Sequence, residues 1–307
     1  MGFGHGHGHA AGTAAYAYRK RMMLVLGIVV SITAAQVVGA ALSGSMALLA
    51  DAAHSLTDGT GVGLALLATV IAARPASTKR TFGLQRAEIL AAMTNAVVVG
   101  VAAVLVLIGG VRRLADPGEV ESGIMLLAAL VGLIGNATSL LILRRGQQES
   151  LNVRGAYLEV LGDMLGSMAV VLAAIVIMVT DYVRADAIAS ILIGLMILPR
   201  AWMLLREVLH VLLEATPKGV DLDDVRRHMM EVPGIVDVHD LHAWTITSGV
   251  PVISAHVVVD ELKLDECGNE SILDGLHGCL AGHFDIEHST FQIEPRGHVD
   301  HEYARHD

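Results

Sequence analysis

From Met46 to Ala73 the sequence reads MALLADAAHSLTDGTGVGLALLATVIAA, an apolar run that is interrupted by Asp51, His54 and Asp58. A bilayer core of about 30 Å requires roughly 20 helical residues, so this run is long enough to cross a membrane. A charged side chain at the bilayer centre costs about 2.5–3.5 kcal/mol on insertion scales, and such residues usually mark a functional site. The run therefore predicts a membrane helix with a polar site in its interior.

Five other apolar runs of similar length accompany it, and the 307-residue chain is 53% hydrophobic with a mean hydropathy of +0.58. Soluble proteins rarely reach that value, so we expect an all-α membrane domain of six helices. The other predicted spans are Met22–Leu42, Ile89–Val111, Gly123–Leu143, Gly155–Val179 and Ala185–Leu205. The last of these is the weakest, because Pro199 and Arg200 interrupt it.

Basic residues gather on one side of the six runs. Twelve Lys or Arg residues fall on the side that holds both termini, and three (Arg112, Arg113 and Arg184) fall on the other. Positive charge is enriched in cytoplasmic loops of membrane proteins. We therefore expect both termini in the cytoplasm, and a lipid-embedded protein of the bacterial inner membrane.

The chain changes character after residue 215. From Thr216 onward it has 6 Lys/Arg against 18 Asp/Glu, and 10 of the 15 histidines. This acidic balance argues against nucleic acid as a partner and favours cations. Turn residues and periodicity predict a small α+β domain in the order αββαβ. Its predicted elements are Asp221–Val232, Ile235–Thr247, Val252–Val259, Ser271–Phe284 and His288–Ile293.

We accordingly divide the chain into four parts. A flexible histidine-rich tail (1–17) precedes the membrane domain (18–215), the α+β domain (216–296) and a disordered tail (297–307). In the first part His5, His7 and His9 alternate with glycine, which is typical of a flexible metal-binding tract.

Two of the predicted spans carry charged residues well inside them, and both use the same spacing. His54 and Asp58 are four residues apart, as are Glu159 and Asp163, so each pair lies on one helix face. One nitrogen and three carboxylates can close a tetrahedral site around a divalent ion. The alternative, that the four only pin two helices together, is disfavoured because no Lys or Arg is expected at that depth. Without metal the carboxylates should bind protons, so that protons and metal compete for one site.

Asp51 lies three residues before His54, on a neighbouring helix face. We expect it to orient the His54 ring, as partners of metal-binding histidines do. A separate proton site is the alternative.

In the α+β domain, His239 and His242 are three residues apart on a predicted strand. Side chains alternate along a strand, so we expect the two histidines on opposite faces and not on one ion.

Several segments resemble the cation diffusion facilitator family. The segment SMALLADAAHSLTD, from Ser45 to Asp58, resembles the second-helix signature of that family. Further matches are Phe82-Gly83 with Arg86-Ala87-Glu88, Asn152–Ala156, the segment VPGIVDVHDLHAW from Val232 to Trp244, and His288-Ser289-Thr290. The likeness runs from about Tyr18 to Pro295.

The resemblance implies a homodimeric, proton-coupled exporter of divalent metal ions with six helices and a cytoplasmic ferredoxin-like domain. It also implies a cytoplasmic metal site at the dimer interface, formed by His239, His256 and Glu294, with His288 as a further candidate. Ordinary surface histidines on an acidic domain are the alternative.

One residue departs from the family pattern. Zinc-transporting members usually carry His where this chain has Glu159, and a carboxylate shifts metal preference toward harder ions such as Mn²⁺ or Fe²⁺. One imidazole remains, so we expect Zn²⁺ as the cargo, with Mn²⁺, Fe²⁺, Co²⁺ or Cd²⁺ as alternatives. An enzyme is not expected, because four protein ligands leave no open position for water. A membrane-bound metal sensor is the other class, and it needs no ligands in the membrane.

Overall fold

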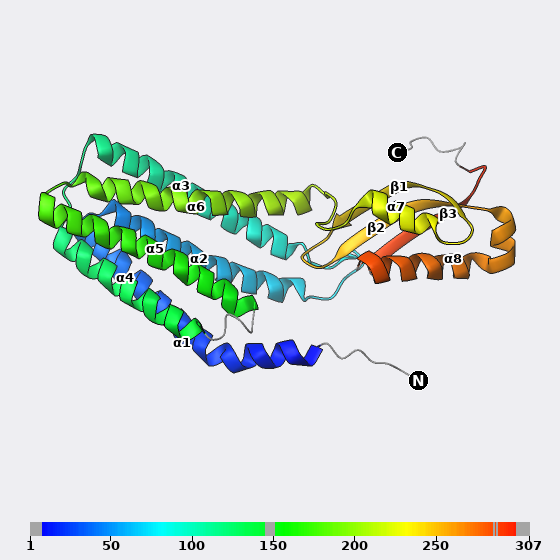
Figure 1. Cartoon of the computed structure of the whole chain (residues 1–307), viewed down its shortest axis with the longest axis horizontal. Helices are drawn as coiled ribbons and strands as arrows, with labels where there is room; N and C mark the ends of the chain where they lie inside the picture. Colours follow the sequence, from blue (N-terminus) through cyan, green and yellow to red (C-terminus); the bar gives the residue numbers. More distant parts are fainter. Residues whose placement is uncertain (1–7, 145–150, 285, 287, 299–307) are drawn as a thin grey trace. The chain divides into compact units, whose positions relative to one another are not determined.

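The computed structural model describes residues 8–144, 151–284, 286 and 288–298, and for 8–20, 151–152, 261–268 and 282–283 the backbone alone. Within these residues, six helices are long and apolar enough to cross a membrane (Figure 1). They are α1 (Gly8–Ser43), α2 (Met46–Ala72), α3 (Ala87–Ala115), α4 (Ser122–Leu143), α5 (Leu151–Thr180) and α6 (Arg184–Leu212). The prediction of six membrane helices is confirmed.

Apolar side chains cover the outward faces of these helices. Leu127, Ile134 and Leu141 recur every seven residues along α4 and are between 64% and 71% exposed. A stripe of this kind would be unfavourable in water, whereas lipid chains solvate it well. The chain is an integral membrane protein.

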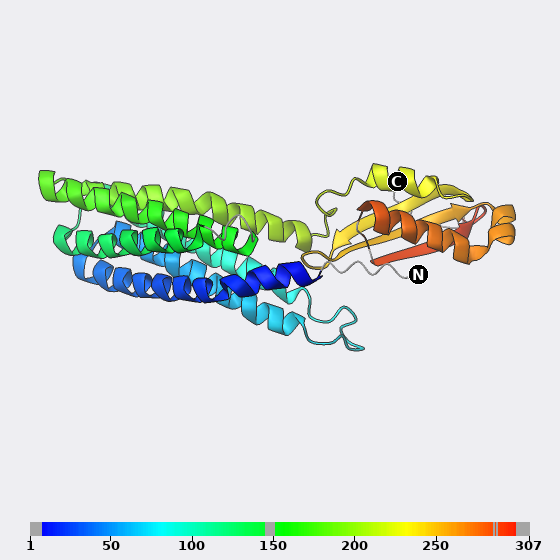
Figure 2. The ribbon, with the colours of Figure 1, turned by 60° about the horizontal axis from the view of Figure 1, so that its bottom comes forward.

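Small residues allow α1 and α4 to approach closely, and the two helices lie side by side (Figure 2). A Cβ added at Gly39 would lie 2.4 Å from the Cβ of Ala128, and one at Gly135 would lie 2.4 Å from Ile32 Cδ1. Helix α4 also contacts α5 along its length. Membrane helices have no hydrophobic driving force toward one another, so close packing of small residues takes its place.

Helix α6 runs without a break from Arg184 to Leu212, although the sequence led us to expect an interruption at Pro199. Proline lacks the N–H that would bond the carbonyl four residues earlier, but membrane helices tolerate this loss. Close packing against α3 supports the helix before the proline, since a Cβ at Gly194 would lie 2.9 Å from the side chain of Leu107. Because the helix is uninterrupted, Arg200 has a defined position on α6.

A carboxylate of α6 fixes the start of α2. Asp186 is 1% exposed and accepts hydrogen bonds from the Met46 N–H at 2.8 Å, the Ala47 N–H at 3.1 Å and the Ser45 hydroxyl at 2.5 Å. The first amides of a helix have no partner within it, and negative charge is favourable there. Arg113 of α3 lies 3.4 Å from the same carboxylate. This group holds in place the helix that carries the predicted polar site.

The chain after α6 forms the predicted small α+β domain. Its elements are α7 (Leu222–Met230), β1 (Ile235–Thr245), β2 (Pro251–Val259), α8 (Glu261–Phe284) and β3 (His288–Pro295). The strand order is β1-β2-β3, with β2 antiparallel to β1 and parallel to β3. The order αββαβ and the α+β class are confirmed.

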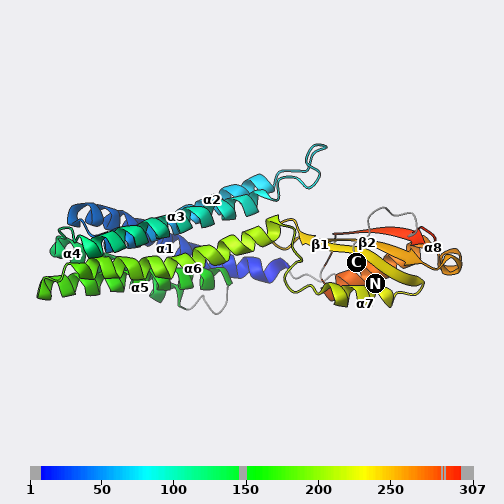
Figure 3. The same ribbon diagram turned by 90° about the horizontal axis from the view of Figure 1, so that it is seen from above.

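One face of this sheet forms the core of the domain, and Figure 3 shows α7 and α8 on the same side of the strands. Val238, Ile253 and Val257 of the strands belong to one buried cluster with Met229 of α7 and Leu276 of α8. Because side chains alternate along a strand, the opposite face is left for other residues.

The two largest differences from the predicted helix boundaries are at the starts of α1 and α8. Helix α1 begins at Gly8, within the segment expected to be a flexible tail, and α8 begins at Glu261 instead of Ser271. Contacts divide the chain into two compact units. One contains the residues up to Leu64 and Thr94–Leu204, and the other contains Ala65–Met93 and the residues from Leu205 onward.

Candidate metal centres

Polar residues of α2 and α5 meet inside the membrane domain. His54 and Asp58 are one turn apart on α2, and Asp163 projects from α5. His54 Nδ1 lies 3.8 Å from Asp58 Oδ1, and His54 Nε2 lies 3.7 Å from Asp163 Oδ1. One donor atom from each residue lies within 4.8 Å of the other two. These three residues, three of the four that spacing predicted, are termed the membrane cluster.

The donor atoms of the membrane cluster are placed to receive a small cation. Separations of 3.7 and 3.8 Å are too long for hydrogen bonds, and His54 Nδ1 and Asp163 Oδ1 are buried without a hydrogen-bond partner among the described residues. A tetrahedral zinc ion with bonds of about 2.0–2.1 Å requires donors about 3.4 Å apart. The two separations involve different ring nitrogens of His54, and only one of these can face a shared ion. The side chains would therefore have to turn and move inward to reach that spacing, and one position would be left for a fourth ligand.

Glu159, the fourth residue expected at this site, is engaged by an arginine. Its Oε1 accepts a hydrogen bond from Arg200 Nη2 at 2.9 Å, while Arg200 Nη1 donates to Asp58 Oδ2 at 3.4 Å. The expectation that no basic residue lies at this depth is wrong, because α6 continues through Pro199 and brings the guanidinium to these carboxylates. In this arrangement Glu159 is an ion-pair partner and not a free ligand.

Asp51 belongs to a separate polar group at the centre of the bundle. It accepts hydrogen bonds from Gln36 Nε2 of α1 at 2.5 Å and from Ser167 Oγ of α5 at 2.8 Å, and all three side chains are buried. A side chain at position 166 would force Asp51 to move, since a Cβ on Gly166 would lie 2.5 Å from Asp51 Oδ1. Asp51 thus joins three helices, and the expected hydrogen bond to the His54 ring is not among the contacts of the described residues.

A cavity of about 550 Å³ lies beside the membrane cluster, between α1, α2, α4 and α5. Its polar end is formed by Asp58, Glu159 and Asp163, and most of the remaining wall is apolar. The cavity therefore leaves space for an ion or water beside the carboxylates.

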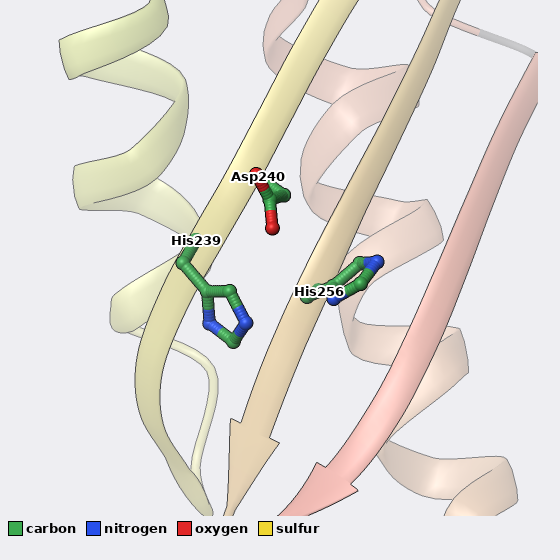
Figure 4. A group of neighbouring side chains, drawn as sticks. All are labelled: His239, Asp240 and His256. Carbon is green, nitrogen blue, oxygen red and sulfur yellow. The ribbon is translucent and has the colours of Figure 1, made fainter. Parts of the chain in front are cut away.

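A second group of metal-ligating residues lies on the α+β domain. His239 and Asp240 of β1 and His256 of β2 each place one donor atom within 4.8 Å of the others (Figure 4). Glu294 of β3 joins them, since its Oε1 lies 2.9 Å from His256 Nδ1 and its Oε2 lies 3.7 Å from His239 Nε2. These four residues are termed the sheet cluster.

A β-bulge determines which residues of β1 reach the sheet cluster. His239 pairs with His256 and His242 pairs with Ser254, so β1 holds one residue more than β2 between the two pairs. Asp240 lies in this bulge with φ +47°. The extra residue places His239 and His242 on the same face of the sheet, whereas simple alternation led us to expect opposite faces. Asp240 was not predicted, because nothing in the sequence pattern marks the bulge.

The remaining candidate histidines are not brought to either cluster. His288 begins β3, six residues before Glu294, which at 3.3 Å per residue is roughly 20 Å away along the strand. It therefore does not join the sheet cluster of the same chain. His5 and His7 lie outside the described residues, and of His9 only the backbone, in the first turn of α1, is described.

Comparison with protein families agrees with this architecture. Residues 22–213 match the model of the cation efflux transmembrane domain, and residues 217–296 match the model of the cation efflux protein cytoplasmic domain. The first match covers the membrane cluster and the second covers the sheet cluster.

Curated relatives match nearly the full length of both chains. The metal cation efflux system protein CzcD of Cupriavidus metallidurans is 45% identical over 260 residues, 85% of this chain and 81% of that protein. The zinc transporter ZitB of Escherichia coli is 39% identical over 270 residues, 87% of this chain and 85% of that protein. A cadmium, cobalt and zinc/H(+)-K(+) antiporter of Bacillus subtilis is 36% identical over 265 residues, 86% and 85% of the two chains.

These relatives are efflux proteins and transporters, so the expectation that the chain is not an enzyme is confirmed. Six membrane helices, a polar cluster within them and the two matching domains together lead to one conclusion. The chain belongs to the cation diffusion facilitator family of cation efflux transporters.

Proposed function

We propose that this transporter exports a divalent transition metal, Zn²⁺ first, from the cytoplasm in exchange for protons. The observation that carries the proposal is the membrane cluster, in which an imidazole and two carboxylates converge with buried atoms that lack hydrogen-bond partners among the described residues. Acidic groups within a membrane domain are expensive unless a cation or a proton neutralises them. A divalent ion would satisfy the donor atoms and the charge together.

The donor types support zinc as the leading cargo. Zn²⁺ accepts nitrogen and oxygen ligands in a tetrahedral arrangement, and His54 supplies the nitrogen that harder ions favour less. The relative ZitB is named as a zinc transporter, and the Bacillus subtilis relative is named for cadmium, cobalt and zinc. Glu159 makes the donor set richer in oxygen, so Mn²⁺, Fe²⁺, Co²⁺ and Cd²⁺ are the alternatives.

Exchange for protons follows from the same carboxylates. Asp58 and Asp163 cannot hold a metal ion and protons on the same oxygen atoms, so binding of one releases the other. If the site faces each side of the membrane in turn, this exclusion couples metal export to proton import. The Bacillus subtilis relative is named as an H(+) antiporter, which supports the same coupling here.

The remaining assignments follow the sequence. The excess of basic residues on one side supports a cytoplasmic position for both termini, and the bacterial relatives favour the inner membrane. We assign the sheet cluster to a regulatory metal ion, and the α+β domain to the interface of a homodimer. His5, His7 and His9 would collect ions at low affinity, and His288 stays a candidate ligand at the dimer interface.

The proposal is tested by metal flux in proteoliposomes with a panel of Zn²⁺, Mn²⁺, Fe²⁺, Co²⁺ and Cd²⁺. We expect Zn²⁺ to be carried fastest, an imposed pH gradient to drive metal uptake, and metal loading to move protons the opposite way. Flux that ignores the pH gradient would contradict antiport. Absence of any metal flux from folded protein would instead favour a sensor.

A further inference from the structure

Arg200 stands between the two helices that supply the membrane cluster. One of its terminal nitrogens contacts Asp58 of α2 at 3.4 Å, and the other contacts Glu159 of α5 at 2.9 Å. The guanidinium therefore bridges carboxylates from α2 and α5, as a metal ion bound to both helices would. Its position is set by α6, which continues through Pro199.

The two contacts of Arg200 with Asp58 and Glu159 are of a kind that breaks readily. The side chain of Arg200 is 47% exposed and that of Glu159 is 42% exposed, so neither charge is locked in a sealed interior. Asp58 and Glu159 also line the cavity beside the membrane cluster, and where that cavity holds water the separated charges are solvated and the ion pair is weak. His54 and Asp163, by contrast, are each 4% exposed and form the buried side of the site.

Both acidic partners of Arg200 are residues that the transported ion needs. A carboxylate oxygen that faces a guanidinium cannot approach a divalent cation without bringing two positive charges together. Arg200 holds Glu159 Oε1 and Asp58 Oδ2, so these two oxygens can bind the ion only after the contacts break, and an ion on either remaining oxygen is repelled by the nearby guanidinium.

We propose that Arg200 is a tethered cation that holds Asp58 and Glu159 while the site is free of metal, and that it sets the affinity of the site by competing with the cargo. This inference rests on the proposed transport function. A transport site must bind its ion well enough to capture it and weakly enough to release it. A built-in competitor lowers affinity without removing a ligand.

The test measures Zn²⁺ binding to the purified full-length protein in detergent, by competition with a chromophoric chelator. The parent protein and Asp163→Ala are compared, and the zinc that this variant no longer binds is assigned to the membrane cluster. Zinc that both proteins bind is assigned to other sites. Arg200→Gln and Arg200→Met both remove the charge, and Met is also favourable in a bilayer if Gln disturbs folding. We expect each to tighten binding at the membrane cluster about 3- to 10-fold, because two weak competing ion pairs are lost.

Two controls separate this role from a structural one. Arg200→Lys keeps the charge and should stay closer to the parent affinity than either neutral variant. Arg206→Gln removes an exposed arginine further along α6, and it should change affinity less than about twofold because distant exposed charges are screened.

A double-mutant cycle tests the release of Glu159. With Arg200 present, Glu159→Gln should weaken zinc binding less than about twofold, whereas in the Arg200→Gln background it should weaken binding about 10-fold. If Arg200→Gln and Arg200→Met both leave zinc binding unchanged or weaker, the proposed role of Arg200 is wrong. If Asp163→Ala still loses the zinc of the membrane cluster in the same assay, the transport site is nevertheless retained. Zinc fully retained in Asp163→Ala would overturn the transport site itself, and the role of Arg200 with it.

Discussion

The membrane cluster and the sheet cluster use the same donor atoms but assemble them differently. In the membrane cluster, His54 and Asp58 follow the repeat of one helix and Asp163 comes from another helix. In the sheet cluster, His239 and His256 face each other across paired strands, with ring centroids 5.2 Å apart. One site is divided between helices that meet only through side chains, whereas the other is fixed by a hydrogen-bonded backbone ladder.

This difference fits two different tasks. Helices that contact one another through side chains can shift or tilt, so donor atoms divided between α2 and α5 can be brought together or separated. Donor atoms on neighbouring strands of one sheet keep their spacing, as a resident ion requires. The membrane cluster is therefore suited to capture and release, and the sheet cluster to a metal ion that stays bound.

The charge around the two clusters differs as well. Arg200 balances Asp58 and Glu159 beside the membrane cluster, and the side chains of Arg200 and Glu159 are partly exposed. In the sheet cluster Glu294 is 1% exposed and lies against two histidines. A cation at the sheet cluster would meet a buried carboxylate that already lies between two imidazoles, while a cation at the membrane cluster would, in the role proposed for Arg200, compete with the guanidinium.

The largest effect should come from removing a ligand of the membrane cluster. Asp58→Ala or Asp163→Ala deletes one of three converging donors, and we expect Zn²⁺ flux in proteoliposomes to fall about 100-fold or more. Zinc binding at the sheet cluster should persist in both variants. Asp116→Ala, which removes an exposed carboxylate beyond the end of α3, serves as the control. Flux at the parent rate in either ligand variant would show that the membrane cluster is not the transport site.

A smaller effect should follow from Asp240→Ala in the sheet cluster. Loss of this carboxylate should weaken zinc binding there about 10-fold, because one of the converging donors is removed. Maximal flux should stay within about twofold of the parent if, as proposed, the ion held there is regulatory and is not the cargo. The binding is measured in the Asp163→Ala background, with Asp274→Ala on the exposed face of α8 as the control. A large fall in flux in Asp240→Ala itself would instead show that the sheet cluster takes part in transport together with the membrane cluster.

The same contrast explains what could be predicted from the sequence. Long apolar runs predicted the six spans, and a spacing of four residues predicted that His54 and Asp58 share a helix face, because helix geometry is regular. Asp240 could not be found in this way, since a bulge shifts the strand period by one residue without a signal in the sequence.

Arg200 was missed for a different reason. The sequence pattern treated Pro199 as an interruption, so the arginine after it was assigned to the end of a weak span. Helix α6 continues through the proline, and the side chain that was taken to interrupt the span instead faces Asp58 and Glu159. A proline within an apolar run is therefore a poor marker of where a membrane helix ends.

The smallest and most specific effect concerns metal choice and the variant Glu159→His. Imidazole favours Zn²⁺ over Mn²⁺ and Fe²⁺, whereas carboxylate does so less. The variant also removes the acidic partner that Arg200 holds at 2.9 Å, which leaves the guanidinium with Asp58 alone. A neutral ring at this position is free to turn toward His54 and Asp163.

Competitive flux of Zn²⁺ against Mn²⁺ at a fixed pH measures this effect, with Glu159→Gln as a neutral control that offers no imidazole. We expect the ratio to rise about 10-fold in favour of Zn²⁺ in Glu159→His, which corresponds to about 1.4 kcal/mol, and to rise less in Glu159→Gln. A ratio that does not change would mean that Glu159 stays with Arg200 throughout the transport cycle. The ion would then be held by His54, Asp58 and Asp163 with a water molecule, and selectivity would rest on a single imidazole.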